Sequence, residues 1–177
     1  MANPVRLAEL LPGAPDVAVA GVSLDSRRVR PGELYAALPG QHTHGARFTA
    51  QAVAQGAVAV LTDQEGRALI DADVPVVVVD DPRTALAEVA AAVQGHPARS
   101  MRMFGITGTN GKTSTMFLLE AALANLGETV GTLGTIGFRV AGRQLERSRS
   151  TVTTPEAPDL QQLLADLRDA GASSVAM

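Results

Sequence analysis

The 177-residue chain contains no cysteine and no tryptophan, and Lys112 is its only lysine. Without cysteine the chain can form neither a disulfide nor a thiolate metal site, and a cytoplasmic location is the simplest expectation. Aromatic residues make up only 3% of the sequence. This scarcity argues against a surface that stacks nucleic-acid bases.

Positive charge and long apolar segments are also scarce. The net charge is −3 and the pI is near 5.6, so no broad basic field exists to attract nucleic acid. No apolar run approaches the roughly 20 residues that a membrane helix needs. The N-terminal apolar run is short and is interrupted by Arg6 and Glu9, which is not typical of a signal peptide.

The most informative stretch is residues 104–115, FGITGTNGKTST. It reads as a strand, a glycine-rich turn and the start of a helix, and this is the arrangement of a Walker-type phosphate-binding loop. Lys112 would meet the β and γ phosphates of a nucleoside triphosphate, and the Thr113 hydroxyl would bind Mg²⁺. The predicted ATP-binding residues are Gly108, Thr109, Asn110, Gly111, Lys112, Thr113 and Ser114.

This loop departs from the common pattern GxxxxGK[ST], because Ile106 stands where the first glycine is expected and the glycine lies at Gly105. The alternative is a glycine-rich turn that binds nothing. The sole lysine argues against that alternative. The other basic residues are all arginine, and a compact ammonium suits the phosphates where a planar guanidinium does not.

Apolar strand patterns alternate with helical ones through the first hundred residues, which predicts a compact α/β domain at residues 1–98. Pro82 follows Asp81 as a first-turn proline follows an N-cap. The predicted strands are 17–22, 34–38, 57–61 and 76–79, and the predicted helices are 48–56, 64–71 and 82–94.

Two polar segments interrupt this pattern. Leu24–Arg27 is either an ordinary turn or a ligand site. The loop at residues 39–45 contains His42 and His44, two positions apart. A metal site there would need a further ligand, and none is evident nearby in the sequence, so a ligand contact or a solvated loop is favoured.

Residues 99–177 are predicted as the first part of a P-loop domain with a mostly parallel sheet. A strand at 103–107 enters the phosphate loop, a hairpin with its turn at Gly142 follows, and a helix begins near Pro158 before a last strand, SSVAM. The helix after the loop is predicted to bury one face, formed by residues at steps of three and four: Met116, Leu119, Leu123 and Leu126.

Four segments taken together resemble the Mur ligase family, and within it the UDP-N-acetylmuramoyl-tripeptide synthetases. In chain order they are Leu24–Arg27, residues 41–43 with the following FTAQAVAQGAVAVL, Gly108–Thr113, and Thr151–Pro155. The resemblance implies an N-terminal domain that binds the UDP end of the substrate and a central ATPase domain at residues 99–177. The residues it implies as substrate contacts are Leu24, Ser26, Gln41, His42 and Thr43 for UDP, and Thr153 and Thr154 for the muramoyl peptide.

The resemblance also implies the reaction. It is an ATP- and Mg²⁺-dependent amide ligation in peptidoglycan biosynthesis, in which meso-diaminopimelate or L-lysine is added to UDP-N-acetylmuramoyl-L-alanyl-D-glutamate through an acyl phosphate. Lys112 would be the catalytic cation. The family's acidic Mg²⁺ ligand, carbamylated lysine and C-terminal domain have no counterpart in this sequence. We therefore expect an N-terminal fragment that does not catalyse ligation alone.

Three alternatives remain open from the sequence. One is a related ligase such as a folylpolyglutamate synthetase. Another is a non-catalytic module that binds ATP. The third is a plain P-loop phosphotransferase, which would leave the 100 residues before the loop without an obvious role.

Overall fold

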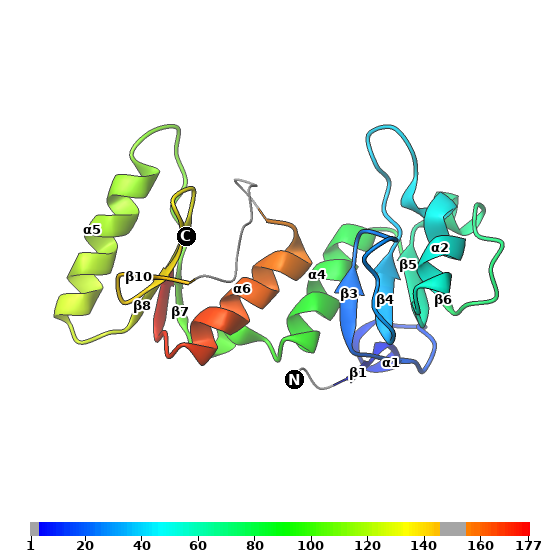
Figure 1. The fold of residues 1–177 in the computed structure, drawn as a ribbon, viewed down its shortest axis with the longest axis horizontal. Coiled ribbons are helices and arrows are strands. Elements are labelled where there is room, and N and C mark those ends of the chain that lie inside the picture. The colour runs from blue at the N-terminus through cyan, green and yellow to red at the C-terminus, as the bar shows by residue number, and fades with distance from the viewer. Residues whose placement is uncertain (1–3, 146–154) are drawn as a thin grey trace. The chain divides into compact units, whose positions relative to one another are not determined.

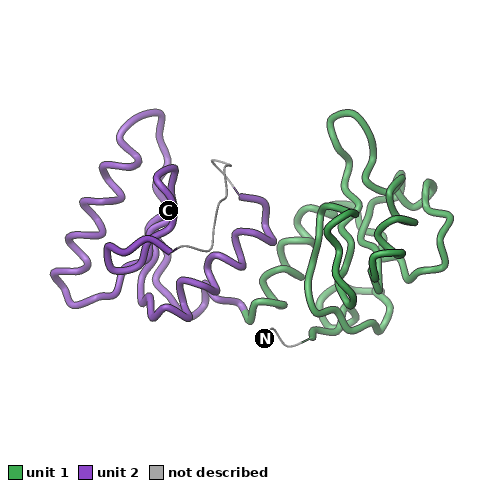
Figure 2. The backbone as a smooth tube through the Cα atoms, viewed as in Figure 1, with its two compact units in different colours: residues 1–95 green, residues 96–177 purple. Residues whose placement is uncertain are grey.

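The computed structural model describes residues 4–145 and 155–177. The chain divides into two compact units, Met1–Gly95 and His96–Met177 (Figures 1 and 2). Each unit combines helices with a sheet that contains parallel strands, so the predicted α/β class is confirmed. Within the described ranges, no helix has both the length and the apolar character needed to cross a bilayer.

Unit 1 is built on a four-stranded parallel sheet in the order β3-β4-β5-β6. Strand β5 is buried at all four positions, as the apolar run there predicts. A separate two-stranded antiparallel sheet joins β1 to β2. The strands are β1 Val5–Arg6, β2 Ala18–Val19, β3 Gly21–Ser23, β4 Glu33–Ala36, β5 Ala59–Thr62 and β6 Val76–Val78.

The longest helix of unit 1, α4 (Pro82–Val93), begins and ends as predicted. Asp81 caps it by accepting hydrogen bonds from the backbone of Arg83 and Thr84, both at 3.1 Å. Its apolar face packs into a core with β4 and β5. The other helices of the unit are short: α1 Leu7–Leu10, the 3₁₀ helix η1 Gly45–Phe48, α2 Thr49–Ala54 and α3 Gln64–Arg67.

The strand predicted at residues 17–22 is in fact two strands. β2 pairs antiparallel with β1, whereas β3 pairs parallel with β4. Between them, the Ala20 N–H donates to the Gly32 carbonyl at 2.9 Å. A single apolar run therefore contributes one strand to each of two sheets. Pairing with distant segments determines where the run divides.

Unit 2 contains a five-stranded sheet in the order β10-β9-β8-β11-β7. The last strand, β11, lies between β8 and β7 and runs parallel to both. Strands β8, β9 and β10 form an antiparallel meander. The strands are β7 Arg102–Phe104, β8 Val130–Gly134, β9 Gly137–Val140, β10 Arg143–Gln144 and β11 Ser174–Ala176, and the helices are η2 Pro97–Ser100, α5 Lys112–Asn125 and α6 Ala157–Asp169.

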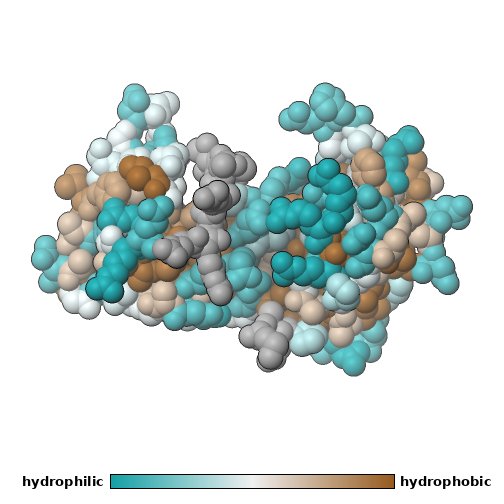
Figure 3. Space-filling view, viewed as in Figure 1, coloured by the Kyte–Doolittle hydropathy of each residue, from teal (hydrophilic) through white to brown (hydrophobic). Residues whose placement is uncertain are grey.

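Helix α6 buries one face, with Leu163, Leu164 and Leu167 in the core. Helix α5 buries the face that the sequence predicts only in part. Met116 and Leu123 are buried, but Leu126 is 77% exposed and is not a core residue. Figure 3 shows hydrophobic surface on the side of unit 2 that carries α5. Because α5 is apolar on nearly all sides, its sequence period does not identify the buried face.

Candidate functional site

The predicted phosphate loop connects β7 to α5 and is anchored at its first residues. The Met177 N–H donates to the Phe104 carbonyl at 2.9 Å, and the Ile106 N–H donates to the Met177 carbonyl at 2.6 Å. The loop therefore leaves the sheet beside the end of β11. In a parallel sheet this carboxyl edge is where ligands bind.

Glycines shape the rest of the loop. Gly108 and Gly111 have φ of 149° and 79°, values that favour glycine. A Cβ atom at Gly105 or Gly111 would meet nothing within 4 Å, so the backbone is open to an approaching group. No side chain among the described residues caps the start of α5. Its first N–H groups are free to bind phosphate.

Lys112 is the first residue of α5, and its side chain is exposed. Its Nζ turns back over the loop, donating to the Gly108 carbonyl and, at 3.5 Å, to that of Thr109. Thr113 follows and is partly exposed, whereas Thr109, Asn110 and Ser114 are fully on the surface. The loop thus brings together the ammonium group of a long side chain, a hydroxyl and several main-chain donors, and these are the groups that bind a triphosphate.

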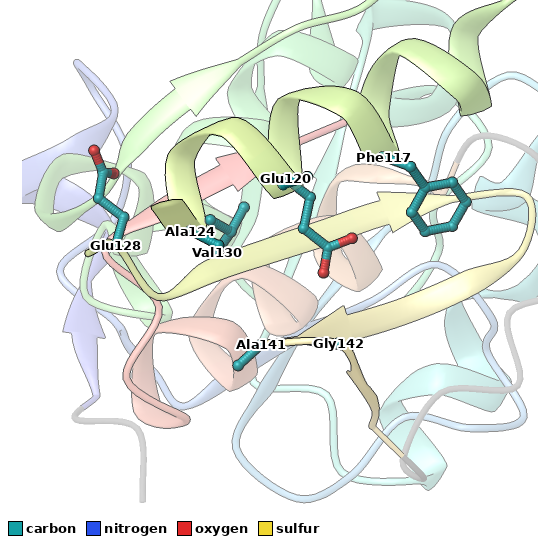
Figure 4. A pocket seen from close by; sticks show the side chains of 8 residues that line it. Phe117, Glu120, Ala124, Glu128, Val130, Ala141 and Gly142 are labelled. Atoms are coloured by element: carbon teal, nitrogen blue, oxygen red, sulfur yellow. The ribbon is translucent and has the colours of Figure 1, made fainter. Parts of the chain in front are cut away.

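A separate hollow of about 340 Å³ lies elsewhere in unit 2. In Figure 4 the side chains of Phe117 and Glu120 extend from α5, which forms one wall of the hollow, beside the strands that form the other wall. The guanidinium of Arg139 lies 5.2 Å from the centre of the Phe117 ring. None of the phosphate-loop residues lines this hollow, so it is distinct from the candidate nucleotide site.

Unit 1 presents its polar segments at the carboxyl edge of its own sheet. Residues 24–27 follow β3, the loop at 37–45 follows β4, and Asp63 follows β5. Because the strands are parallel, all three segments begin at the same edge. The topology therefore brings together the two polar segments that the sequence singled out.

In the first of these segments, Ser26 is buried and Asp25 is paired. The Ser26 hydroxyl donates to Oε1 of Gln51 at 2.7 Å. Asp25 accepts hydrogen bonds from the side chain and backbone of Arg27, which lower the pKa of its carboxyl group to about 2. Leu24 is partly buried against the core of unit 1.

The loop at residues 37–45 has an exposed tip and a buried base. Gln41, His42 and Thr43 are exposed. At the base, the Tyr35 hydroxyl donates to the Gly45 carbonyl at 2.8 Å. Burial raises the pKa of Tyr35, the charge of Asp25 raises it further, and Ser26 opposes the rise.

The sequence did not indicate several residues of this arrangement. Tyr35 reads as an ordinary strand residue, and its only signal is that it is the single tyrosine of the chain. Gln51 and Asp63 carry no sequence signal, because their partners lie 25 and 19 residues away. Thr153 and Thr154 lie outside the described residues. Across residues 4–145 and 155–177, no three His, Asp or Glu side chains cluster as a metal site would require.

Comparison with protein-family models gives two matches. A model described as the Mur ligase family, catalytic domain, matches residues 18–94, and the Mur ligase middle domain matches residues 106–177. The chain belongs to the Mur ligase family. The resemblance carried by the four sequence segments is thereby confirmed.

Among the curated Mur ligases, the chain is 51% identical to the UDP-N-acetylmuramoyl-L-alanyl-D-glutamate–2,6-diaminopimelate ligase of Streptomyces avermitilis, over 92% of the chain and 31% of that protein. It is 42% identical to the ligase of that name from Xanthomonas campestris, over 100% of the chain and 36% of that protein. It is 44% identical to the UDP-N-acetylmuramyl-tripeptide synthetase of Roseiflexus, over 88% of the chain and 30% of that protein. The chain therefore spans about a third of the length of these Mur ligases.

Solved Mur ligase structures have the same fold. A UDP-N-acetylmuramoyl-L-alanyl-D-glutamate–2,6-diaminopimelate ligase superposes with a TM-score of 0.77 and 26% identity, over 99% of this chain and 35% of that one. MurF of Thermotoga maritima, solved in complex with ADP, superposes with a TM-score of 0.52 and 20% identity, over 88% of this chain and 30% of that one. At that identity the second match supports the fold alone.

Proposed function

We propose that this chain, which spans about a third of the length of its curated relatives, belongs to an ATP-dependent ligase of peptidoglycan synthesis. It would add a diamino acid to UDP-N-acetylmuramoyl-L-alanyl-D-glutamate. The observation that carries the proposal is the phosphate loop, with a lone lysine at the start of α5, in a chain 42–51% identical to ligases named for that reaction. We also propose a cytoplasmic location, because the reaction needs the UDP-linked substrate and ATP in the same compartment.

The two units would have separate roles. Residues 1–98 would bind the UDP end of the substrate, and residues 99–177 would bind ATP. Supporting this division, the polar segments of unit 1 and the phosphate loop of unit 2 each lie at the carboxyl edge of a different sheet. Parallel sheets bind ligands at that edge.

At the phosphate loop, Lys112 would exchange the carbonyls of Gly108 and Thr109 for the β and γ phosphates. Asn110 and the main-chain N–H groups from Gly108 to Ser114 would hold the triphosphate in line. Thr113 is the residue of this chain that fits Mg²⁺, because its hydroxyl lies at the helix start, beside the main-chain groups that would hold the phosphates. Bound there, the ion would neutralise charge on the transferred phosphoryl group.

The chemistry would proceed in two steps. The terminal carboxylate of the UDP-linked dipeptide attacks the γ phosphorus, and the bond to ADP breaks, giving an acyl phosphate. The amine of the diamino acid then attacks the acyl carbon and releases inorganic phosphate. Lys112 would stabilise the charge that develops in the first step.

The UDP end would contact Leu24, Ser26, Gln41, His42 and Thr43, and the muramoyl peptide would contact Thr153 and Thr154. Of these, the exposed loop tip is free to meet a ligand. The Ser26 hydroxyl already donates its hydrogen bond to Gln51, so it would accept hydrogen bonds from a ligand or act through Gln51.

The test uses the full-length protein with ATP, Mg²⁺, UDP-N-acetylmuramoyl-L-alanyl-D-glutamate and labelled meso-diaminopimelate. L-Lysine replaces the diamino acid in a parallel reaction, and a folate with glutamate serves as the control substrate pair. One amide product for each phosphate released is expected with one of the two diamino acids. Product from the folate pair alone would refute the proposal.

A further inference from the structure

His44 lies at the base of the loop whose tip carries Gln41, His42 and Thr43. Its Nδ1 accepts a hydrogen bond from the Ala46 N–H at 3.0 Å and thereby caps η1. Its Nε2 lies 3.1 Å from Oδ1 of Asp63. Because Nδ1 is an acceptor, the neutral ring carries its proton on Nε2 and donates it to the carboxylate. The two contacts therefore fix both the tautomer and the orientation of the ring.

Asp63 is itself held in place. Its Oδ1 also accepts a hydrogen bond from the Gly66 N–H at 2.7 Å, as the N-cap of α3. Gly66 leaves room for the imidazole, since a Cβ atom there would lie 2.5 Å from Cε1 of His44 and 2.0 Å from Oγ1 of Thr62. The start of α3 therefore packs closely against the His44 ring and accepts its hydrogen bond.

The neighbouring residue, Gly45, is held by two further hydrogen bonds. The Gly45 carbonyl accepts from the Tyr35 hydroxyl at 2.8 Å, and the Gly45 N–H donates to the Leu38 carbonyl at 2.9 Å. Tyr35 is 1% exposed, and the side chain of His44 is 10% exposed. The tip is closed by a hydrogen bond from the Gly40 N–H to the Thr43 carbonyl at 3.1 Å, and residues 41–43 are exposed.

We propose that His44 is a positioning residue for uridine diphosphate binding. Hydrogen-bonded to Asp63, it holds the base of the loop, so that residues 41–43 are already ordered before they contact the ligand. This inference rests on the proposed UDP-binding role of unit 1. His44 is too buried to offer much surface to a ligand, so it acts through the loop. A loop that is ordered before binding avoids the entropy cost of ordering it on binding.

The primary test measures UDP binding to the 177-residue chain by titration calorimetry. His44→Ala is expected to weaken UDP binding by about tenfold, the effect of losing roughly one well-formed hydrogen-bond pair. His44→Asn should recover part of the loss, because its Oδ1 can still accept from Ala46. Mg-ATP binding to unit 2 should be unchanged in both variants.

The matched control is Asp81→Ala. It removes the N-cap of α4 in the same unit, with both of its backbone hydrogen bonds, but it leaves the loop contacts intact. It should lower the melting temperature about as much as His44→Ala while changing the UDP affinity less than twofold. Equal losses of UDP affinity in the two variants would show that His44 acts only through general stability, and would overturn the proposal.

A second measurement does not depend on UDP. Long-range nitrogen NMR should find the neutral His44 ring protonated on Nε2. Amide exchange at Ala46 should accelerate in His44→Ala. A ring protonated on Nδ1, or exchange that does not change, would overturn the positioning role. If the parent chain shows these signatures but does not bind UDP, the proposed UDP-binding role of unit 1 is wrong while the anchoring of the loop stands.

Discussion

The buried hydroxyl of Ser26 donates a hydrogen bond of 2.7 Å to Oε1 of Gln51, 25 residues further along the chain. This bond joins the segment after β3 to helix α2. It links one of the two polar segments of unit 1 to a helix that follows the other. The geometry of the candidate UDP site therefore depends on contacts between segments that are distant in the sequence.

Ser26→Ala should lower the free energy of unfolding by about 1 kcal/mol, because it removes one side-chain hydrogen bond from a buried donor. Gln51→Ala should cost at least as much, since it leaves the buried Ser26 hydroxyl without its acceptor. Urea denaturation of the two single variants and the double variant gives the coupling between them. A coupling of about 0.5–1.5 kcal/mol is expected, and a value of zero would contradict the hydrogen bond.

Lys112→Ala should raise the dissociation constant for Mg-ATP by about 100-fold, because charged hydrogen bonds to phosphate contribute roughly 2–3 kcal/mol. Lys112→Arg should not restore binding, since a planar guanidinium does not replace the compact ammonium. Titration calorimetry on the 177-residue chain measures both. Arg143→Ala, which removes an exposed positive charge on β10 of the same unit, is the control and should bind Mg-ATP as the parent does.

The pairing of Asp25 with Arg27 should make stability depend on pH in the acid range. The pKa of Asp25 is lowered in the folded protein from its usual 3.8 to about 2, chiefly by its side-chain and backbone hydrogen bonds to Arg27. The folded state therefore binds this proton less readily than the unfolded state does. The contribution to stability is present above about pH 4 and is lost as the pH falls towards 2.

Arg27→Met should remove the side-chain bond and move the Asp25 midpoint up towards 3.8 in a carboxyl NMR titration, leaving the backbone N–H bond and the charge of Arg28 to lower it. The change in overall stability should be small, because the Arg27 side chain is 75% exposed and solvent screens the pair. An Asp25 midpoint that stays near 2 in this variant would assign the shift to another cause.

Two leucines near the end of α5 should differ sharply in their effect on stability. Leu123 is 7% exposed and Leu126 is 77% exposed. Leu123→Ala should lower the free energy of unfolding by about 2–4 kcal/mol, whereas Leu126→Ala should change it by less than about 0.5 kcal/mol. Thermal or urea unfolding of the 177-residue chain measures both, and equal losses would contradict the orientation of the helix.

Local features were predicted well because each depends on residues close together in the chain. The strand, glycine turn and helix start of the predicted phosphate loop lie within 12 consecutive residues, and the Asp81 cap with Pro82 marks the start of α4 at its observed position. The α/β alternation was also readable, since buried strands and amphipathic helices differ in their periodicity. The prediction of a single strand at residues 17–22 was wrong, because the division of this segment into two strands depends on pairing with β1 and β4.

The amino-acid order by itself determined a strand, a glycine turn and a lone lysine at a helix start, since neighbouring residues alone create that geometry. Only the tertiary structure decided that His44 meets Asp63, that Tyr35 reaches Gly45, and that Leu126 faces solvent. Those outcomes depend on which strands lie side by side and on which face of a helix meets the sheet. Such contacts join residues far apart in the chain, and no local pattern records them.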